Sequence, residues 1–260
     1  MLPTPELQFG VARVDITPRT PLPMGGYGGR TGPFEGVHDP LYFTALYLRC
    51  EEREVWIGSA DLVQFPDGAE RDAAIAALGR RLGCPPESIF LNATHTHGGP
   101  LTTTSFGVPN PFNRVARSGE NKARTDAWVA GLWETIGDTL EAARRDLQPG
   151  TLHRAEGSTT FPMNRRCPSA HGIHNAPNPR GAFDQRLRLL GVHDAEDRLR
   201  VLLPILACHP TATGSQRRLT ADFVGAWRAR VAREWPGVTF LFLQACGADA
   251  RPAATAAGTE

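Results

Sequence analysis

Several short apolar runs along the chain end abruptly at polar or glycine-rich residues. The clearest four cover residues 55–61, 88–99, 201–211 and 238–249. Continuously apolar runs of this length are typical of strands buried on both faces, as in a sheet covered by helices. Ligand-binding residues of such sheets gather beyond the carboxyl ends of the strands. The pattern predicts an α/β fold with buried mixed or parallel β-sheets covered by helices, and a site at the strand carboxyl ends.

Three segments carry the apolar spacing of amphipathic helices. The first covers residues 67–83, where Asp67 can cap the helix and Gly83 can end it. The second and third cover residues 125–145 and 222–235, each with one apolar stripe. We expect these stripes to pack against the sheet.

Three further stretches, residues 17–36, 102–121 and 164–181, are rich in glycine, proline and asparagine. They are too long for simple connections, and long loops inside a compact domain are usually functional or disordered. We expect them to form the walls of an active site. Since no repeat or linker divides the chain, we expect one domain over residues 1–260.

The composition is that of an ordinary globular protein, with 41% hydrophobic and 21% charged residues. Twenty-eight basic and 27 acidic residues leave a formal charge of +1, so no overall field attracts nucleic acid or an anionic membrane. No apolar run approaches the roughly 20 residues of a transmembrane helix, and the first ten residues lack the features of a signal peptide. We therefore expect no nucleic-acid partner and no transmembrane segment. As written, the chain is expected to be cytoplasmic, or secreted if its N-terminus is incomplete.

Two histidines stand close together at the end of one predicted strand. Residues two apart on a strand point to the same side, so His95 and His97 can face one point in space. His209 ends another predicted strand, and three converging imidazoles are a typical start of a zinc site. The alternative is that these histidines satisfy hydrogen bonds of the core.

Other polar or small residues near the strand ends have two interpretations each. Gly98 and Gly99 would let a substrate or a backbone segment approach the histidines, or they form a tight turn. Asp61 and Asp222 are candidates for carboxylates that orient ligating imidazoles, or they cap turns and helices. His38 is a candidate substrate contact.

An ordered set of motifs resembles the neutral/alkaline (non-lysosomal) ceramidase family. In chain order they are GVARVDITP, MGGYG, GVHDPLYFTALYL, ADLV, NATHTHGGP, MNRR with HNAPNP, ACHPTATG with LTADFVG, and GADARP. They extend over about residues 9–252, nearly the whole chain. NATHTHGGP together with HPT and a following aspartate is the most specific part, and the order of the motifs is more specific than any one of them.

The resemblance implies a zinc-dependent amidohydrolase with an α/β catalytic domain that cleaves the amide bond of N-acylsphingosine. His95 matches the first histidine of the family's H-T-H motif and would ligate Zn²⁺, and His209 matches a second ligand. His97 would bind the substrate or the attacking group. Arg165 would act on the substrate or on the developing oxyanion. Three other motif residues belong to the expected catalytic or substrate-binding set: Asp249, Tyr27 and Asn164.

Two departures from the family pattern bear on the mechanism. The family's Gly-Asp-x-Ser-Pro segment carries a serine proposed as nucleophile or substrate-activating group, and the aligned residue here is Arg251. An arginine cannot act as a nucleophile at ordinary pH. The family's glutamate and tyrosine metal ligands lie downstream of this motif, beyond Glu260. We expect either a catalytic domain that is incomplete at its C-terminus, or a metal held by fewer protein ligands.

These observations lead to one main hypothesis and two alternatives. The main hypothesis is a zinc-dependent hydrolase of an amide (N-acyl) bond in a small molecule or lipid, not necessarily ceramide, in which water attacks directly and Arg165 and Arg251 stabilise the oxyanion. The first alternative is a non-catalytic or truncated relative that only binds a ligand. The second is a metallophosphoesterase, which needs a denser set of carboxylates than Asp61, Asp222 and Asp249 provide.

Overall fold

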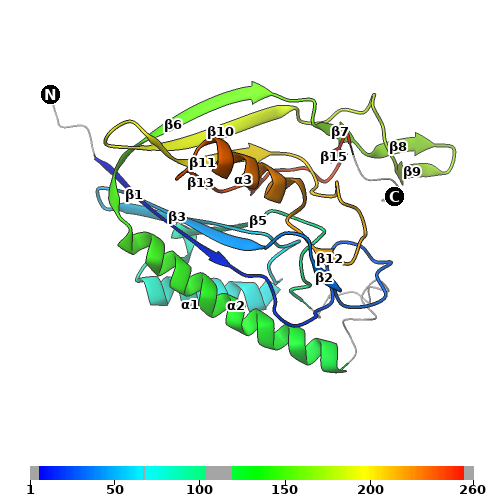
Figure 1. Cartoon of the computed structure of the whole chain (residues 1–260), viewed down its shortest axis with the longest axis horizontal. Coiled ribbons are helices and arrows are strands. Elements are labelled where there is room, and N and C mark those ends of the chain that lie inside the picture. The colour runs from blue at the N-terminus through cyan, green and yellow to red at the C-terminus, as the bar shows by residue number, and fades with distance from the viewer. Residues whose placement is uncertain (1–5, 67, 104–118, 255–260) are drawn as a thin grey trace.

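The computed structural model describes residues 6–66, 68–103 and 119–254. In this part of the chain, nine strands form one large sheet in the order β13-β11-β10-β6-β1-β3-β4-β5, with β14 also paired to β11 (Figure 1). The nine strands are β1 (Leu7–Asp15), β3 (Tyr42–Cys50), β4 (Arg53–Ala60), β5 (Ile89–Ala93), β6 (Gln148–Ser158), β10 (Arg186–Asp194), β11 (Leu199–Leu206), β13 (Thr239–Phe240) and β14 (Leu243–Gln244).

The sheet is mixed, which confirms the predicted fold class. Its centre is antiparallel, whereas β4 and β5 at one end and β11, β13 and β14 at the other are parallel pairs. All four apolar runs form strands, and the last of them is split into β13 and β14. The strands β1, β3, β6 and β10 were not predicted. In the long strand β6 nearly all residues are exposed, and its sequence carries no apolar pattern.

Three α-helices lie within the described residues: α1 (Gly68–Leu82), α2 (Gly119–Arg145) and α3 (Asp222–Glu234). All three were predicted. The helix α2 begins earlier than residue 125, in a segment where Glu120 pairs with Arg124 and Lys122 with Asp126, four residues apart. The expected cap Asp67 lies outside the described residues.

Helices pack against both halves of the sheet (Figure 1). The helices α1 and α2 pack on the half formed by β1, β3, β4 and β5, where Trp56 and Ile136 are fully buried. The helix α3 packs on β11 and β13. A third apolar cluster joins Phe9 of β1 and Leu46 of β3 to Val201 of β11, so the sheet bends and its two halves face each other.

The bend brings the two ends of the sheet together. The Asn92 amide of β5 donates to the Gln244 carbonyl of β14 at 3.1 Å, and the Gln244 backbone N–H donates back to the Asn92 side-chain oxygen at 2.9 Å. Next to them, the Ser59 hydroxyl donates to the Phe242 carbonyl at 2.5 Å. These bonds hold the carboxyl ends of β5 and β11 beside each other, and the segments that follow these two strands carry His95 and His209.

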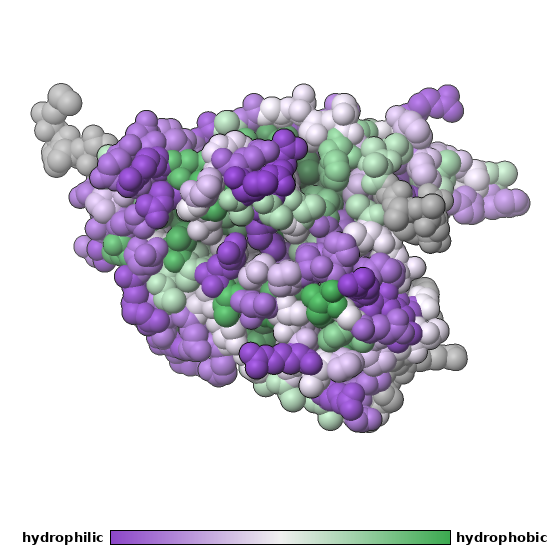
Figure 2. All heavy atoms as spheres, viewed as in Figure 1, coloured by the Kyte–Doolittle hydropathy of each residue, from purple (hydrophilic) through white to green (hydrophobic). Residues whose placement is uncertain are grey.

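Small strand pairs fix the loops around this end. They are β2 (Gly36–Val37) with β12 (Arg218–Leu219), β7 (Pro162–Asn164) with β15 (Ala250–Pro252), and the hairpin of β8 (Arg166–Ser169) and β9 (Gly172–Asn175). Figure 2 shows one face of the molecule, on which hydrophilic side chains surround scattered apolar ones. Among the helices described, none is long and apolar enough to cross a lipid bilayer.

Candidate metal centre

The structure brings together the three histidines that the sequence singled out. The candidate ligand atoms of His95, His97 and His209 all lie within 4.8 Å of one another. The ring centroids of His95 and His209 are 4.4 Å apart, and that of His97 lies 5.2 Å from the first and 5.1 Å from the second. The three rings therefore surround one small volume.

The reason predicted for this convergence is wrong. Strand β5 ends at Ala93, so strand alternation does not align His95 with His97. His95 instead has a left-handed backbone conformation with φ of 67°. This turn of the chain directs the His95 ring toward the segment after β11, where His209 lies.

Backbone carbonyls fix the tautomers of two imidazoles. His95 Nδ1 lies 2.6 Å from the Val63 carbonyl oxygen, and His209 Nδ1 lies 2.8 Å from that of Gly247. A carbonyl oxygen can only accept, so both Nδ1 atoms carry the proton. In the neutral rings, both Nε2 atoms therefore present a lone pair.

All three imidazoles are held in the neutral form. Burial, together with the positive charge of nearby Arg165, lowers the pKa of His209 to about 3. Burial and the two neighbouring histidines lower the pKa of His97 to about 2. Burial also lowers the pKa of His95. Neutral imidazole is the form that binds a metal.

These residues fit a zinc ion. His95 Nε2 and His209 Nε2 face each other at 3.0 Å, and two deprotonated nitrogens cannot form a hydrogen bond at that distance. A cation between them relieves the repulsion of the lone pairs. Two imidazole nitrogens on one tetrahedral Zn²⁺ lie about 3.3 Å apart, given the usual Zn–N distance. His97 Nδ1 is buried beside them and has no hydrogen-bond partner among the residues that the structure describes.

Arg165 lies directly against this group. Its Nη2 donates to His209 Nε2 at 3.0 Å, and its Nε donates to the Ala248 carbonyl at 3.0 Å. Burial lowers the pKa of Arg165, and the positive charges of Arg166 and Arg251 lower it further. The guanidinium therefore lies near other arginines and against the neutral His209 ring.

A polar pocket of about 270 Å³ opens beside the histidines. Tyr27 packs edge-on against His97, with ring centroids 5.0 Å apart, and within the described part of the chain its buried hydroxyl has no hydrogen-bond partner. Burial raises the pKa of Tyr27, so the phenol keeps its proton. The residues that line the pocket are Gly26, Tyr27, His97, Arg165, Asn175, Thr211 and Arg251.

The two aspartates expected to orient the imidazoles do not contact them. Asp61 is fully buried and pairs with Arg228 of α3 at 2.7 Å, while accepting from the Tyr42 backbone N–H at 2.9 Å. Burial raises the pKa of Asp61, and the guanidinium opposes this shift. Asp222 accepts from the backbone N–H groups of Ala212 and Thr213, at 3.0 and 2.8 Å. It therefore fixes the segment after His209, whereas the helix α3 has Ala221 as its N-cap and no side-chain cap, so the expected helix cap is wrong.

Two of the expected substrate contacts have structural partners instead. The Asn164 amide donates to the Ala182 carbonyl at 2.6 Å, and its oxygen accepts from the Arg166 backbone N–H at 2.8 Å, so this side chain holds the arginine segment in place. The His38 imidazole is 64% exposed, contacts Asp39 and does not line the pocket. The backbone carbonyl of Asp249 accepts from the Arg165 N–H at 2.8 Å, so Asp249 positions that arginine.

Gly98 and Gly99 allow other backbone segments to pack closely against them. A side chain at Gly98 would meet the Thr220 carbonyl oxygen at 2.5 Å, and one at Gly99 would lie 3.2 Å from that of Asp61. Both interpretations hold, because His97 and Gly98 form a turn and another backbone segment approaches the glycines closely. Thr96 assists by donating to the Thr220 carbonyl at 2.8 Å and accepting from the Gly98 N–H at 3.1 Å.

Sequence reasoning missed three residues of the pocket. Gly26 has φ of 90°, and a Cβ there would lie 2.5 Å from His97 Cγ, so glycine is required for the close approach. Asn175 and Thr211 also line the pocket. The signals were present, since Gly26 lies in the first glycine-rich loop, Asn175 in the third and Thr211 in the HPT segment.

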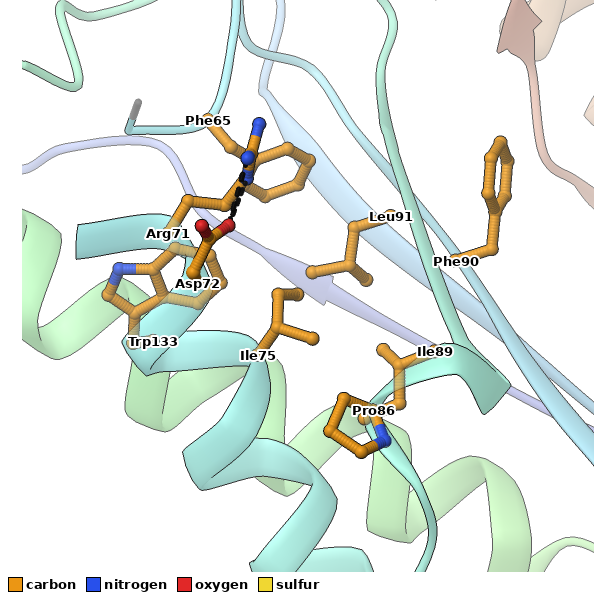
Figure 3. Close-up of a pocket in the computed structure, with 9 residues that line it drawn as sticks. All are labelled: Phe65, Arg71, Asp72, Ile75, Pro86, Ile89, Phe90, Leu91 and Trp133. Carbon is orange, nitrogen blue, oxygen red and sulfur yellow. Dashed lines mark hydrogen bonds and ion pairs between the residues drawn. The ribbon is translucent and has the colours of Figure 1, made fainter. Parts of the chain in front are cut away.

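A second, larger cavity lies away from the three histidines and is lined mainly by apolar side chains. It measures about 450 Å³ and lies between α1, α2 and β5. In Figure 3 the apolar side chains of Ile75, Ile89 and Leu91 point toward one another across it, with the Arg71–Asp72 pair at its rim. Among the described residues that line it, only Asp72 is a candidate metal ligand.

A second group of candidate ligands lies on the surface. The ligand atoms of His153, His193 and Asp197 also fall within 4.8 Å of one another. The Asp197 side chain is 85% exposed and bonds to His193 Nδ1 at 2.9 Å. Exposed groups of this kind need no metal, so this group provides a control for non-specific metal uptake.

Comparison with protein-family models finds no match, and comparison with curated proteins finds none either. Solved structures do match. The neutral ceramidase from Pseudomonas aeruginosa has a TM-score of 0.78 at 20% sequence identity, over 96% of this chain and 40% of its own. A ceramidase complexed with C2 has a TM-score of 0.77 at 21% identity, over 96% and 39%. This chain spans about two fifths of the length of those proteins. It therefore has the fold of the neutral ceramidases, as the resemblance of its motifs predicts.

Proposed function

We propose that this chain is a zinc-dependent hydrolase of the amide bond in an N-acyl substrate. The observation that carries the proposal is the pair of Nε2 atoms of His95 and His209, which face each other at 3.0 Å beside a polar pocket. His95 and His209 would hold the ion, and further ligands would come from water, substrate or other protein groups. Zinc supplies polarisation of the acyl carbonyl and lowers the pKa of a water that it binds to about 7.

The surrounding residues take the remaining roles. His97 binds the attacking water or the substrate through Nδ1, for which no described residue provides a hydrogen-bond partner. Arg165 donates to the acyl oxygen as negative charge develops on it, and one preorganised donor of this kind is worth about 3 kcal/mol. In the reaction the water oxygen bonds to the acyl carbon, the C–N bond breaks, and both water protons end on the amine, giving a carboxylate and an ammonium product.

Direct attack by water is the route that this chain supports. The position of the family's serine is Arg251, which cannot form an acyl-enzyme. Arg251 lines the pocket with Arg165, so it adds positive charge near the developing oxyanion. A mechanism without a covalent intermediate is therefore expected.

A binding function without turnover is the second candidate, and one contact favours it. Arg165 donates to His209 Nε2, the lone pair that a metal would use. If that contact persists in solution, His209 cannot ligate, and the pocket binds an N-acyl compound without cleaving it.

The test is an assay of amide hydrolysis on a panel of N-acyl amines, with product formation followed by mass spectrometry. We expect turnover by the zinc-loaded protein, loss of turnover with a chelator, and loss in His95→Ala and His209→Ala. The matched control is His153→Ala, in the surface group, which should behave like the unaltered protein. Hydrolysis that persists in metal-free His95→Ala protein would contradict the proposal.

A further inference from the structure

The pocket beside the histidines has an excess of positive charge. Two of the seven residues that line it, Arg165 and Arg251, are arginines, and none is an aspartate or glutamate. Arg251 lies on β15 opposite Met163 of β7, so an antiparallel strand pair holds its backbone. A third arginine, Arg166, lies next in the chain and donates to the same Ala248 carbonyl as Arg165, at 2.8 Å.

The positive charges affect one another. Arg165 and Arg251 line one pocket, and Arg166 shares the Ala248 carbonyl with Arg165, so the three guanidiniums repel one another. Grouping cations in a partly buried pocket is unfavourable unless an anion is bound there. An anionic ligand would relieve this repulsion.

Hydrogen-bond donors in the pocket also need acceptors. The buried Tyr27 hydroxyl has no partner in residues 6–66, 68–103 and 119–254, and it keeps its proton because burial raises its pKa. Buried polar groups left unpaired cost free energy, so such atoms mark a place where a ligand binds. The Asn175 amide and the Thr211 hydroxyl lie in the same lining. A ligand that matches this set carries several acceptor oxygens close together.

We propose that the substrate is an N-acyl amide that also carries a carboxylate near the scissile bond. Arg251 pairs with this carboxylate, while Arg165 donates a hydrogen bond to the acyl oxygen. The planar guanidinium matches a carboxylate with two parallel hydrogen bonds. This inference rests on the proposed function. It assigns to Arg251 a role in choosing the substrate, at the position where the related family has a serine.

The experiment compares matched acid and neutral amides. The two pairs are N-octanoylglycine against N-octanoylglycinamide, and the monoamide of a dicarboxylic acid against its diamide. We expect the zinc-loaded protein to prefer the acid in at least one pair by about 10- to 100-fold in kcat/KM, the usual worth of a charge-assisted hydrogen bond. Arg251→Met should abolish the preference and Arg251→Lys should keep part of it. The control Arg233→Met, on the exposed last turn of α3, should keep all of it.

Calorimetric binding of N-octanoylglycine and its carboxamide to the metal-free protein separates the two proposals. Selective binding of the acid, lost in Arg251→Met, with no hydrolysis of any amide would overturn the proposed function and leave the anion site standing. Hydrolysis of both members of each pair at equal rates would overturn the anion site and leave the proposed function standing. The comparison in the unaltered protein decides the question even if Arg251→Met fails to fold.

Discussion

At the scale of single residues, the site depends on a backbone conformation that most side chains avoid. His95 has φ of 67°, which costs about 1–2 kcal/mol for a residue other than glycine. Such a conformation persists where the surroundings over-determine it. Here the bond from Nδ1 to the Val63 carbonyl fixes the ring, so Nε2 points in one direction before any metal arrives.

Replacing Arg165 should separate metal binding from turnover. Arg165→Met removes both a positive charge and the donor that occupies His209 Nε2, so zinc affinity should rise by about 3- to 10-fold, the equivalent of one hydrogen bond. Turnover should fall, because the donor to the acyl oxygen is lost. Zinc titration with a competing chelator and a hydrolysis assay measure the two effects. Weaker zinc binding in the variant would show that Arg165 supports the metal rather than competing with it.

Gly26 should be intolerant of a side chain. Gly26→Ala places a methyl group 2.5 Å from His97 Cγ at a φ of 90°, so His97 must move. We expect a loss of about 1–2 kcal/mol in unfolding free energy and a larger relative loss of activity. The control is Gly29→Ala, because a Cβ at Gly29 meets no atom within 4 Å. Equal activity in the two variants would show that the position of His97 is not critical.

The histidines of the site could be found from sequence, but their partners could not. His95 and His209 were recognisable because each follows an apolar run. Carboxylates were expected to orient them, yet backbone carbonyls of Val63 and Gly247 do so. Any residue can supply a carbonyl, so no sequence pattern marks this contact. For the same reason the structural roles of Asn164 and Asp249 were not evident.

At the scale of elements, the sequence predicted the apolar runs that end at polar or glycine-rich residues and the helices with one apolar stripe, and it missed β1, β3, β6 and β10. The strands β4, β5 and β11 and the helix α3 carry continuous or periodic apolar residues and were predicted. The strand β6 does not, because most of its side chains face solvent. It is stabilised by its pairing along the whole of β10, a long-range contact that local sequence does not reveal.

The turn between β10 and β11 should make stability depend on pH. Asp194 is buried and accepts from the Arg198 and Arg200 guanidiniums at 2.9 and 3.2 Å. Burial raises its pKa, but the Arg198 backbone N–H and these guanidiniums outweigh burial and lower the pKa to about 2. The folded value lies below the unfolded value of about 3.9, so this stabilisation is complete above about pH 4 and is lost as the pH falls to about 2.

Urea unfolding of Asp194→Asn at pH 7, 4 and 3 measures this contribution. The variant should be less stable than the unaltered protein at pH 7, and the difference should shrink between pH 4 and pH 3. Asp72→Asn is the control, because the Asp72 side chain is 69% exposed. A difference that stays constant over this range would show that the Asp194 charge contributes nothing to folding.

At the scale of the whole molecule, the bend of the sheet creates the site. His95 and His209 are 114 residues apart, and they meet because Asn92 and Gln244 join the two ends of the sheet. The order of the strands could not be predicted from the runs alone, since nothing in β5 specifies its approach to β14. Local patterns predicted single strands and helices, whereas the resemblance of the motifs to the ceramidase family predicted the whole fold.

The central claim is that His95 and His209 form a metal site, and metal stoichiometry tests it most directly. The protein and its variants are loaded with zinc, freed of excess ion and analysed for metal content. We predict about one zinc per chain in the unaltered protein and in the control variant with both His153 and His193 changed to alanine, and no zinc in His95→Ala or His209→Ala. Zinc retained in both site variants, or absent from the unaltered protein, would contradict the account.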